Sequence, residues 1–206
     1  MAPWYEVKPK RVLLAVGFVV ALGGVLFLAF TGTVKSKTEY KPPPPRAKKV
    51  SLEGFDVRGP ALGKGKAVIL ISSPSCPACR AFVPKILQEL KGHSLYYKHV
   101  RYGKGGDELE RAMECVREKR EELFWDFLKL CYSRPALALT WLSDKTSSDF
   151  VKTCLTDEAV KAALDRDDEQ VRRIGVSAIP AVIVGDELYQ GGVAIKRVLL
   201  EGEKGD

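Results

Sequence analysis

The stretch Ala67-Val-Ile-Leu-Ile-Ser72-Ser-Pro-Ser-Cys76-Pro-Ala-Cys79 decides the fold. Its first six residues form a continuous apolar run rich in β-branched side chains, which is typical of a central strand covered on both faces. Pro77 suits the first turn of a helix, which we expect over residues 77–91. A further strand is predicted over residues 94–102. Together these segments predict a β-α-β unit.

Cys76 and Cys79 enclose Pro77 and Ala78 at the predicted strand-to-helix junction. A helix N-terminus is electropositive and favours a thiolate, so Cys76 is expected to attack disulfides. Cys79 follows one turn later and can resolve the mixed disulfide, while Pro77 and Ala78 tune the pair. A zinc knuckle or an inert disulfide is a weaker alternative, because zinc needs a second ligand pair and the other three cysteines stand singly. We therefore predict a redox-active pair and no metal.

Residues 107–174 are predicted to be almost entirely helical. Leu109 and Met113 mark one apolar face at helical spacing, and Phe127 and Leu130 mark another. We expect Thr156 to cap the N-terminus of the last of these helices. This block is predicted to be a helical insertion in a mixed α/β domain spanning residues 50–206.

A proline precedes a late apolar strand, in the sequence Ile179-Pro180 before residues 181–184. A Gly-Asp turn should join this strand to residues 187–189, and a final helix is predicted over residues 194–201. If the Ile179–Pro180 bond is cis, its loop can expose backbone groups beside the cysteines and hold an extended substrate segment. The alternative is an ordinary trans proline that starts a strand.

The N-terminal part predicts a membrane anchor. After a short tail, residues 1–11, an unbroken run of 19 apolar or glycine residues begins at Val12, and no charge appears until Lys35. A bilayer needs about 20 helical residues, so we interpret residues 12–34 as an uncleaved signal anchor in the lipid bilayer. A cleaved signal peptide is the alternative.

Residues 35–49 predict a basic, proline-rich linker. They hold six Lys or Arg and one acid, and four consecutive prolines should form a stiff polyproline spacer. The net charge of +7 is concentrated in this segment, which fits anionic lipid headgroups better than nucleic acid, since no nucleic-acid recognition motif is present. Counting basic residues favours a cytoplasmic C-terminus, whereas the cysteine chemistry suits an oxidising compartment. We expect the domain on the extracytoplasmic side.

The motifs jointly resemble the thioredoxin superfamily, and within it the DsbA-like branch, over residues 50–201. Cys76-Pro-Ala-Cys79 resembles the active-site motif and Ile179-Pro180 the cis-proline loop that binds substrate. Phe124-Trp125-Asp126-Phe127 and Phe150-Val-Lys-Thr-Cys-Leu155 resemble two phrases of the branch's helical domain. The resemblance implies an α/β thioredoxin-like fold with an inserted helical subdomain.

The resemblance also implies a structural disulfide between Cys115 and Cys154, which leaves Cys131 as an odd, buried thiol. Three reduced core cysteines are the alternative. The sequence departs from the best-known oxidase pattern at Ala78, where a histidine often stands, and at Ile179. The strongly oxidising reduction potential of those oxidases therefore cannot simply be assigned to this protein.

The sequence thus predicts a membrane-anchored thiol:disulfide oxidoreductase that forms disulfides in cysteine-containing client proteins. A membrane redox partner would reoxidise it, and no small-molecule cofactor is required. The enzymatic alternatives are a membrane-tethered reductase and an isomerase. The non-enzymatic alternatives are a client-binding module with inert cysteines and a metal-delivery protein.

Overall fold

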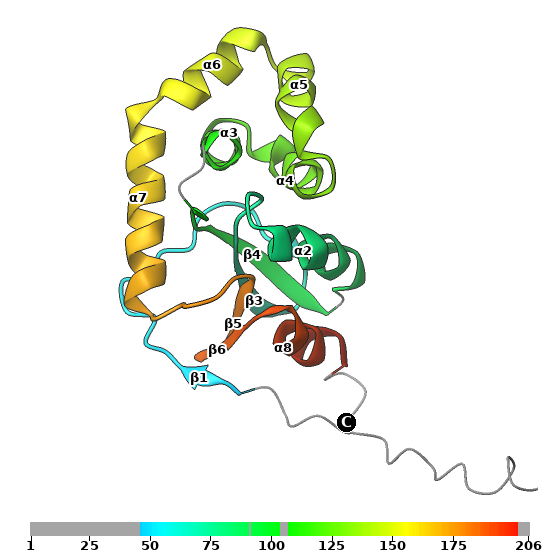
Figure 1. Ribbon diagram of the computed structural model, residues 1–206, viewed down its shortest axis with the longest axis vertical. Helices are drawn as coiled ribbons and strands as arrows, with labels where there is room; N and C mark the ends of the chain where they lie inside the picture. Colours follow the sequence, from blue (N-terminus) through cyan, green and yellow to red (C-terminus); the bar gives the residue numbers. More distant parts are fainter. Residues whose placement is uncertain (1–45, 91, 104–106, 202–206) are drawn as a thin grey trace, which may run out of the picture. The chain divides into compact units, whose positions relative to one another are not determined.

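A computed structural model describes residues 46–90, 92–103 and 107–201 (Figure 1). The predicted tail, the predicted anchor over residues 12–34 and the linker up to residue 45 lie outside the described residues. Within the described ranges, no helix combines the length and apolar character that crossing a membrane requires.

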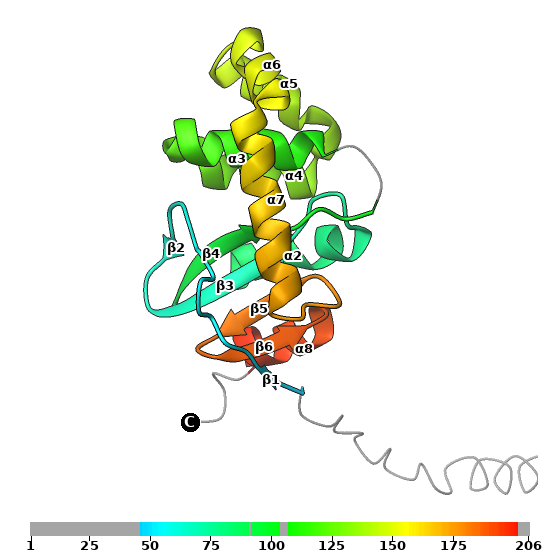
Figure 2. The ribbon, with the colours of Figure 1, turned by 90° about the vertical axis from the view of Figure 1, so that its left-hand side faces the viewer.

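Six strands form one mixed sheet in the order β1-β6-β5-β3-β4-β2. β3 pairs in parallel with β4, whereas β5 runs antiparallel to β3 (Figure 2). The strands are β1 (Lys48–Lys49), β2 (Leu62–Gly63), β3 (Lys66–Ser72), β4 (His93–His99), β5 (Ala181–Val184) and β6 (Glu187–Gln190). The predicted β-α-β unit is therefore present at the centre of the sheet.

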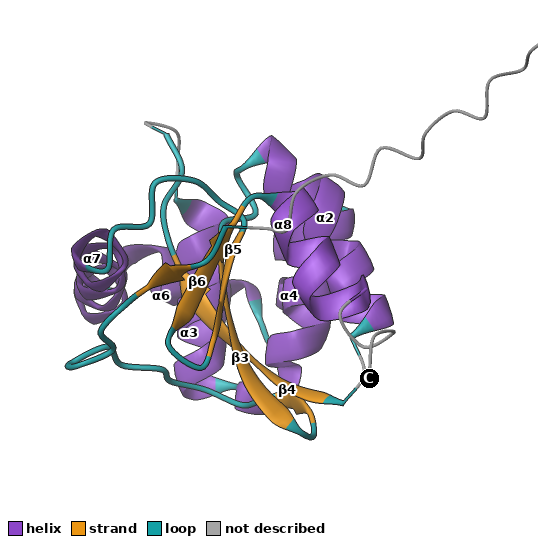
Figure 3. Cartoon of the chain, turned by 90° about the horizontal axis from the view of Figure 1, so that it is seen from below, coloured by secondary structure: helices purple, strands orange, loops and turns teal. Residues whose placement is uncertain are grey.

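Helices cover both faces of this sheet. α2, α4 and α8 lie on one side and α7 on the other (Figure 3). The helices are α2 (Pro77–Glu89), α3 (Glu108–Lys119), α4 (Phe124–Ser133), α5 (Pro135–Lys145), α6 (Ser148–Thr156), α7 (Glu158–Arg173) and α8 (Gly192–Lys196), with a 3-10 turn over Glu121–Leu123 and a π-helical turn over Arg197–Glu201. The run from α3 to α7 corresponds to the expected helical insertion.

The core around the sheet consists of two clusters, one on each face, because alternate side chains of a strand point to opposite faces. Val68 and Leu70 of β3 belong to a large cluster with α2 and α4, whereas Ile71 packs with Val171 of α7. Successive side chains of a strand point to opposite faces, so a strand covered on both sides must be apolar at every position. Each fully buried side chain of this kind contributes about 1.5–3 kcal/mol.

A buried ionic cluster lies beneath α7. The Lys98 ammonium of β4 is 1% exposed and donates to Asp167 Oδ1 at 2.7 Å, Gln170 Oε1 at 2.7 Å and the Asp56 carbonyl at 2.6 Å. A buried charge is tolerated only when it is paired and hydrogen-bonded. Lys98 therefore ties α7 and the segment before β2 to the sheet.

One predicted cap is wrong. Asp157, rather than Thr156, caps α7, because its carboxylate accepts from the Ala159 N–H at 2.9 Å. Thr156 instead ends α6, where its hydroxyl donates to the Lys152 carbonyl at 3.0 Å. A carboxylate at this position also benefits from the positive end of the helix dipole.

Other boundaries differ from the prediction by a few residues. The strand predicted over 94–102 ends at His99, because its parallel partner β3 ends at Ser72 opposite it. Lys48 and Lys49, predicted to belong to the linker, pair with β6 as β1. The helix predicted over 77–91 ends at Glu89, since Leu90 has an extended backbone, and the final helix begins at Gly192 instead of Ala194.

Candidate functional site

The two neighbouring cysteines lie where β3 ends and α2 begins. Cys76 is the N-cap of α2, with an extended backbone (φ −82°, ψ 122°), and Pro77 occupies the first turn. The Cys76 N–H donates to the Ser73 carbonyl at 3.2 Å, which closes the turn between strand and helix. Both cysteines are free thiols, with Cys76 2% and Cys79 0% exposed.

A groove opens in front of Cys76. It has a volume of about 580 Å³ and includes Pro77, Ala78 and Ile179 in its lining. The Ile179–Pro180 peptide bond is cis, so Pro180 is not the ordinary trans proline that the sequence left open as the alternative. The predicted site residues Cys76, Pro77, Ala78 and Ile179 therefore come together at one surface, although a hundred residues of chain separate the two segments.

The loop before the cis proline is held by one side chain. Gln190 Oε1 accepts from the Ser177 N–H at 2.7 Å and from the Ala178 N–H at 2.9 Å. The Pro180 carbonyl accepts from the Gly191 N–H at 2.8 Å. These bonds from the β6 end fix the wall of the groove that faces Cys76.

Arg101 and Tyr102 also line the groove. Arg101 Nε lies 2.6 Å from Asp168 Oδ2, and its Nη2 lies 2.5 Å from Asp165 Oδ1, so α7 anchors the guanidinium. Tyr102 is 48% exposed. The lining of the groove therefore includes an exposed aromatic ring next in sequence to a fixed cation.

A network of hydroxyls lies behind Cys79. The Tyr132 hydroxyl donates to Ser72 Oγ at 2.8 Å, the Tyr97 hydroxyl donates to the Ser72 carbonyl at 2.8 Å, and the two phenol oxygens are 2.7 Å apart. Burial, with a smaller contribution from Cys76, raises the pKa of the Cys79 thiol to about 12. Hydrogen bonds with the Ser72 side chain and the Ser73 backbone lower the Cys79 pKa and so favour its thiolate.

A buried carboxylate holds the loop between β3 and α2. Glu110 of α3 is 1% exposed, and its Oε1 accepts from Ser73 Oγ at 2.6 Å and from Ser75 Oγ at 2.8 Å. Its Oε2 is buried and has no hydrogen-bond partner among the residues that the structure describes. The helical insertion thus contributes an acid to the loop that presents Cys76.

The remaining cysteines lie elsewhere. Cys115 of α3 and Cys154 of α6 form a disulfide, with an S–S distance of 2.09 Å, and do not line the groove. Cys131 of α4 is fully buried, and burial raises its pKa well above the usual range, with Glu110 adding to the effect. This arrangement matches the pairing that the resemblance implied.

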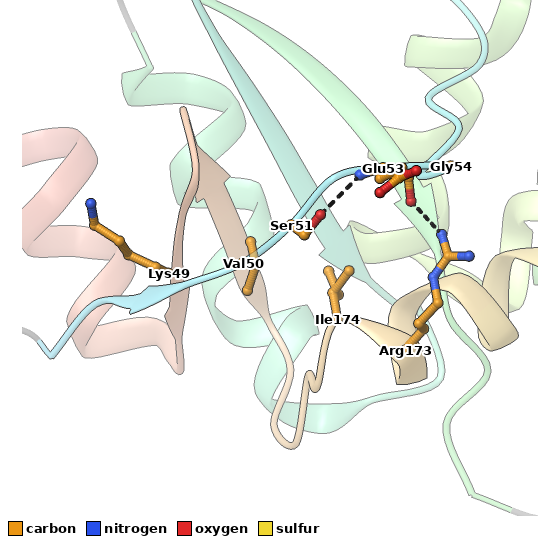
Figure 4. Close-up of a pocket in the computed structure, with 7 residues that line it drawn as sticks. All are labelled: Lys49, Val50, Ser51, Glu53, Gly54, Arg173 and Ile174. Carbon is orange, nitrogen blue, oxygen red and sulfur yellow. Dashed lines mark hydrogen bonds between the residues drawn. The ribbon is translucent and has the colours of Figure 1, made fainter.

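A second cavity of about 550 Å³ lies near the C-terminal end of α7 (Figure 4). Arg173 reaches across it and donates to the Glu53 carbonyl at 2.8 Å, and Ser51 Oγ accepts from the Glu53 N–H at 3.4 Å. This cavity contains no thiol. Among the described residues, no group of three or more His, Cys, Asp or Glu side chains is placed to hold a metal ion.

Several residues at the site were missed by the sequence analysis. They are Ser72, Ser73, Tyr97, Glu110, Tyr132 and Gln190. Ser72 and Ser73 adjoin the motif and could have been suspected from their position at the strand end. Glu110, Tyr132 and Gln190 reach the site only through packing, and their local sequence carries no signal for it.

Comparison with known proteins agrees with this geometry. Residues 57–199 match the thioredoxin family. The search of curated proteins gave no match.

Solved structures share the fold. Oxidised BdbD from Bacillus subtilis is 21% identical, with a TM-score of 0.59 over 79% of this chain and 100% of that chain. The thiol-disulfide exchange protein alpha-DsbA2 from Wolbachia pipientis is 19% identical, with a TM-score of 0.57 over 72% and 89%. ScsC from Proteus mirabilis in a transitional conformation is 17% identical, with a TM-score of 0.61 over 97% and 96%. The predicted thioredoxin-like α/β fold is confirmed, and the chain belongs to the thioredoxin family.

Proposed function

We propose that this protein is a thiol:disulfide oxidoreductase that forms disulfides in client proteins through Cys76 and Cys79. The observation that carries the proposal is the placement of Cys76 at the N-terminus of α2, in a groove whose other wall is the cis Ile179–Pro180 loop. Family membership supports thiol–disulfide exchange as the chemistry of this pair.

In the proposed reaction, the oxidised enzyme holds a Cys76–Cys79 disulfide. A client thiolate attacks Cys76 and forms a mixed disulfide, and a second client thiolate then displaces Cys76. The client leaves with a disulfide, and the enzyme is left with two thiols. The cis-proline loop would hold the client segment in an extended conformation through backbone hydrogen bonds.

The proposal includes the membrane anchor over residues 12–34, an extracytoplasmic domain and a membrane redox partner that reoxidises the thiols. The buried Cys115–Cys154 disulfide favours an oxidising compartment, because structural disulfides are rare in the reducing cytosol. Protease treatment of intact cells tests the topology. Complete protection of the domain from external protease would contradict it.

The first experiment compares the oxidised full-length chain with its Cys76→Ser variant on a reduced, unfolded client. We expect the wild type to form client disulfides stoichiometrically and the variant to form none. Cys131→Ala is the matched control, since that thiol is buried away from the groove, and it should retain full activity. Activity that survives Cys76→Ser would refute the role of the pair.

The reduction potential distinguishes the direction of exchange. A value near about −120 mV, as for DsbA, supports a dithiol oxidase, and one near about −270 mV, as for thioredoxin, favours a tethered reductase. Ala78 makes this measurement necessary, because no imidazolium at this position stabilises the thiolate.

A further inference from the structure

Cys79 must carry a negative charge during exchange, although its surroundings disfavour one. When a client thiolate attacks Cys76 Sγ, a new client–Cys76 bond forms and the Cys76–Cys79 bond breaks. The electron pair of the broken bond goes to Cys79, which leaves as a thiolate. No other oxidant takes part, because the enzyme disulfide itself is reduced.

This leaving thiolate is buried. Cys79 is 0% exposed, so water cannot solvate the charge as it forms. A thiol with a lower pKa leaves faster, and hydrogen bonds to a buried anion are the means of lowering that pKa. The Ser73 backbone supplies one such bond, and the hydroxyl network behind Cys79 supplies another through the Ser72 side chain.

The network directs one proton toward the sulfur. Tyr132 donates its only hydroxyl proton to Ser72 Oγ at 2.8 Å. Because Ser72 Oγ receives that proton, its own proton remains free for the Cys79 sulfur, with which its side chain hydrogen-bonds. Tyr97 supports this direction, because its single hydroxyl proton lies within reach of both the Tyr132 oxygen at 2.7 Å and the Ser72 carbonyl at 2.8 Å and leaves the Tyr132 proton to Ser72.

We propose that Ser72 and Tyr132 act as a hydroxyl pair that stabilises the Cys79 thiolate as the Cys76–Cys79 disulfide opens. Ser72 contacts the reacting sulfur, and Tyr132 is a positioning residue that acts through Ser72. Ser72 ends β3 and Tyr132 belongs to α4, so the helical insertion takes part in the chemistry. The inference rests on the function proposed above.

The test measures the rate at which reduced glutathione attacks the oxidised full-length chain. Loss of the Ser72 hydrogen bond to the charged sulfur should slow the attack by about tenfold in Ser72→Ala. Tyr132→Phe removes the bond that orients Ser72 and should slow the attack by no more than that. Tyr96→Phe is the matched control, because Tyr96 precedes Tyr97 in β4 and points to the other face, and it should react at the wild-type rate.

The double variant separates catalysis from structure. Since Tyr132 acts through Ser72, the combined variant should react no more slowly than Ser72→Ala alone. Fully additive effects, or a wild-type rate in Tyr132→Phe, would overturn the inference.

A second measurement does not depend on exchange activity. In a Cys76→Ser background, iodoacetamide at a fixed pH should alkylate Cys79 more slowly when Tyr132→Phe is added, because a smaller fraction of Cys79 is then thiolate. An unchanged alkylation rate would also overturn the inference. If the wild-type chain does not react with glutathione although this rate falls, the proposed function fails and the hydroxyl pair stands.

Discussion

The molecule contains two cysteine pairs that differ in almost every physical respect. Cys76 and Cys79 lie three residues apart, Cys76 in the lining of the groove and Cys79 fully buried, and both are thiols, whereas Cys115 and Cys154 lie 39 residues apart and are joined. Both thiols of the first pair belong to the large apolar cluster, but Ser72 and Ser73 beside them hydrogen-bond to a phenol and a carboxylate, whereas Val160 and Phe150 pack around the second pair. A short separation with polar groups nearby suits reversible exchange, while a long separation with only apolar neighbours in its cluster suits permanent cross-linking.

The largest expected difference concerns reactivity within the exchanging pair. The Cys79 thiol stays protonated below its raised pKa of about 12, so its thiolate fraction at pH 8 is more than about a thousandfold below that of an ordinary thiol. In the reduced full-length chain, iodoacetamide should label Cys76 and spare Cys79, and labelling of Cys79 should rise about tenfold per pH unit as the pH is raised. Mass spectrometry of each cysteine checks this. Equal labelling of the two thiols at pH 8 would break the distinction.

The second pair should matter for stability rather than for exchange. Replacing both Cys115 and Cys154 by alanine should lower the free energy of unfolding by about 4 kcal/mol, the chain-entropy value for a loop of this length. Urea unfolding of the full-length chain measures the loss. Client oxidation under conditions where the variant is still folded should match the wild type, and a variant that lost activity while folded would show that the pair has a second role.

Cys131 belongs to neither pair, and its replacement should have the smallest effect on stability. Cys131→Ala removes one buried sulfur and should cost about 1 kcal/mol of stability. Because the thiol is fully buried with a raised pKa, iodoacetamide should not label it in the native state. Labelling of Cys131 at the rate of Cys76 would contradict its assignment to the core.

The sequence predicted those parts of the site that are local in the chain. The strand, the loop and the helix around Cys76 could be predicted because burial, helix capping and cysteine spacing act over a few residues. The position of Tyr132 could not, because it depends on how α4 packs against β4. The N-cap of α7 was predicted wrongly for a different reason. Thr156 and Asp157 are both good N-cap residues, and only the path of the backbone decides between them.

The pairing of β4 with β3 constrains how this protein can vary. All seven residues of β4 align with β3, and its neighbours Tyr97 and Lys98 serve opposite faces, one at the hydroxyl network and the other at the ionic cluster. A single inserted or deleted residue before Tyr97 would exchange the two faces and bring an ammonium group among the hydroxyls. Across evolution, changes in chain length should therefore be confined to the loops on either side of this strand, and the strand itself should change only by substitution.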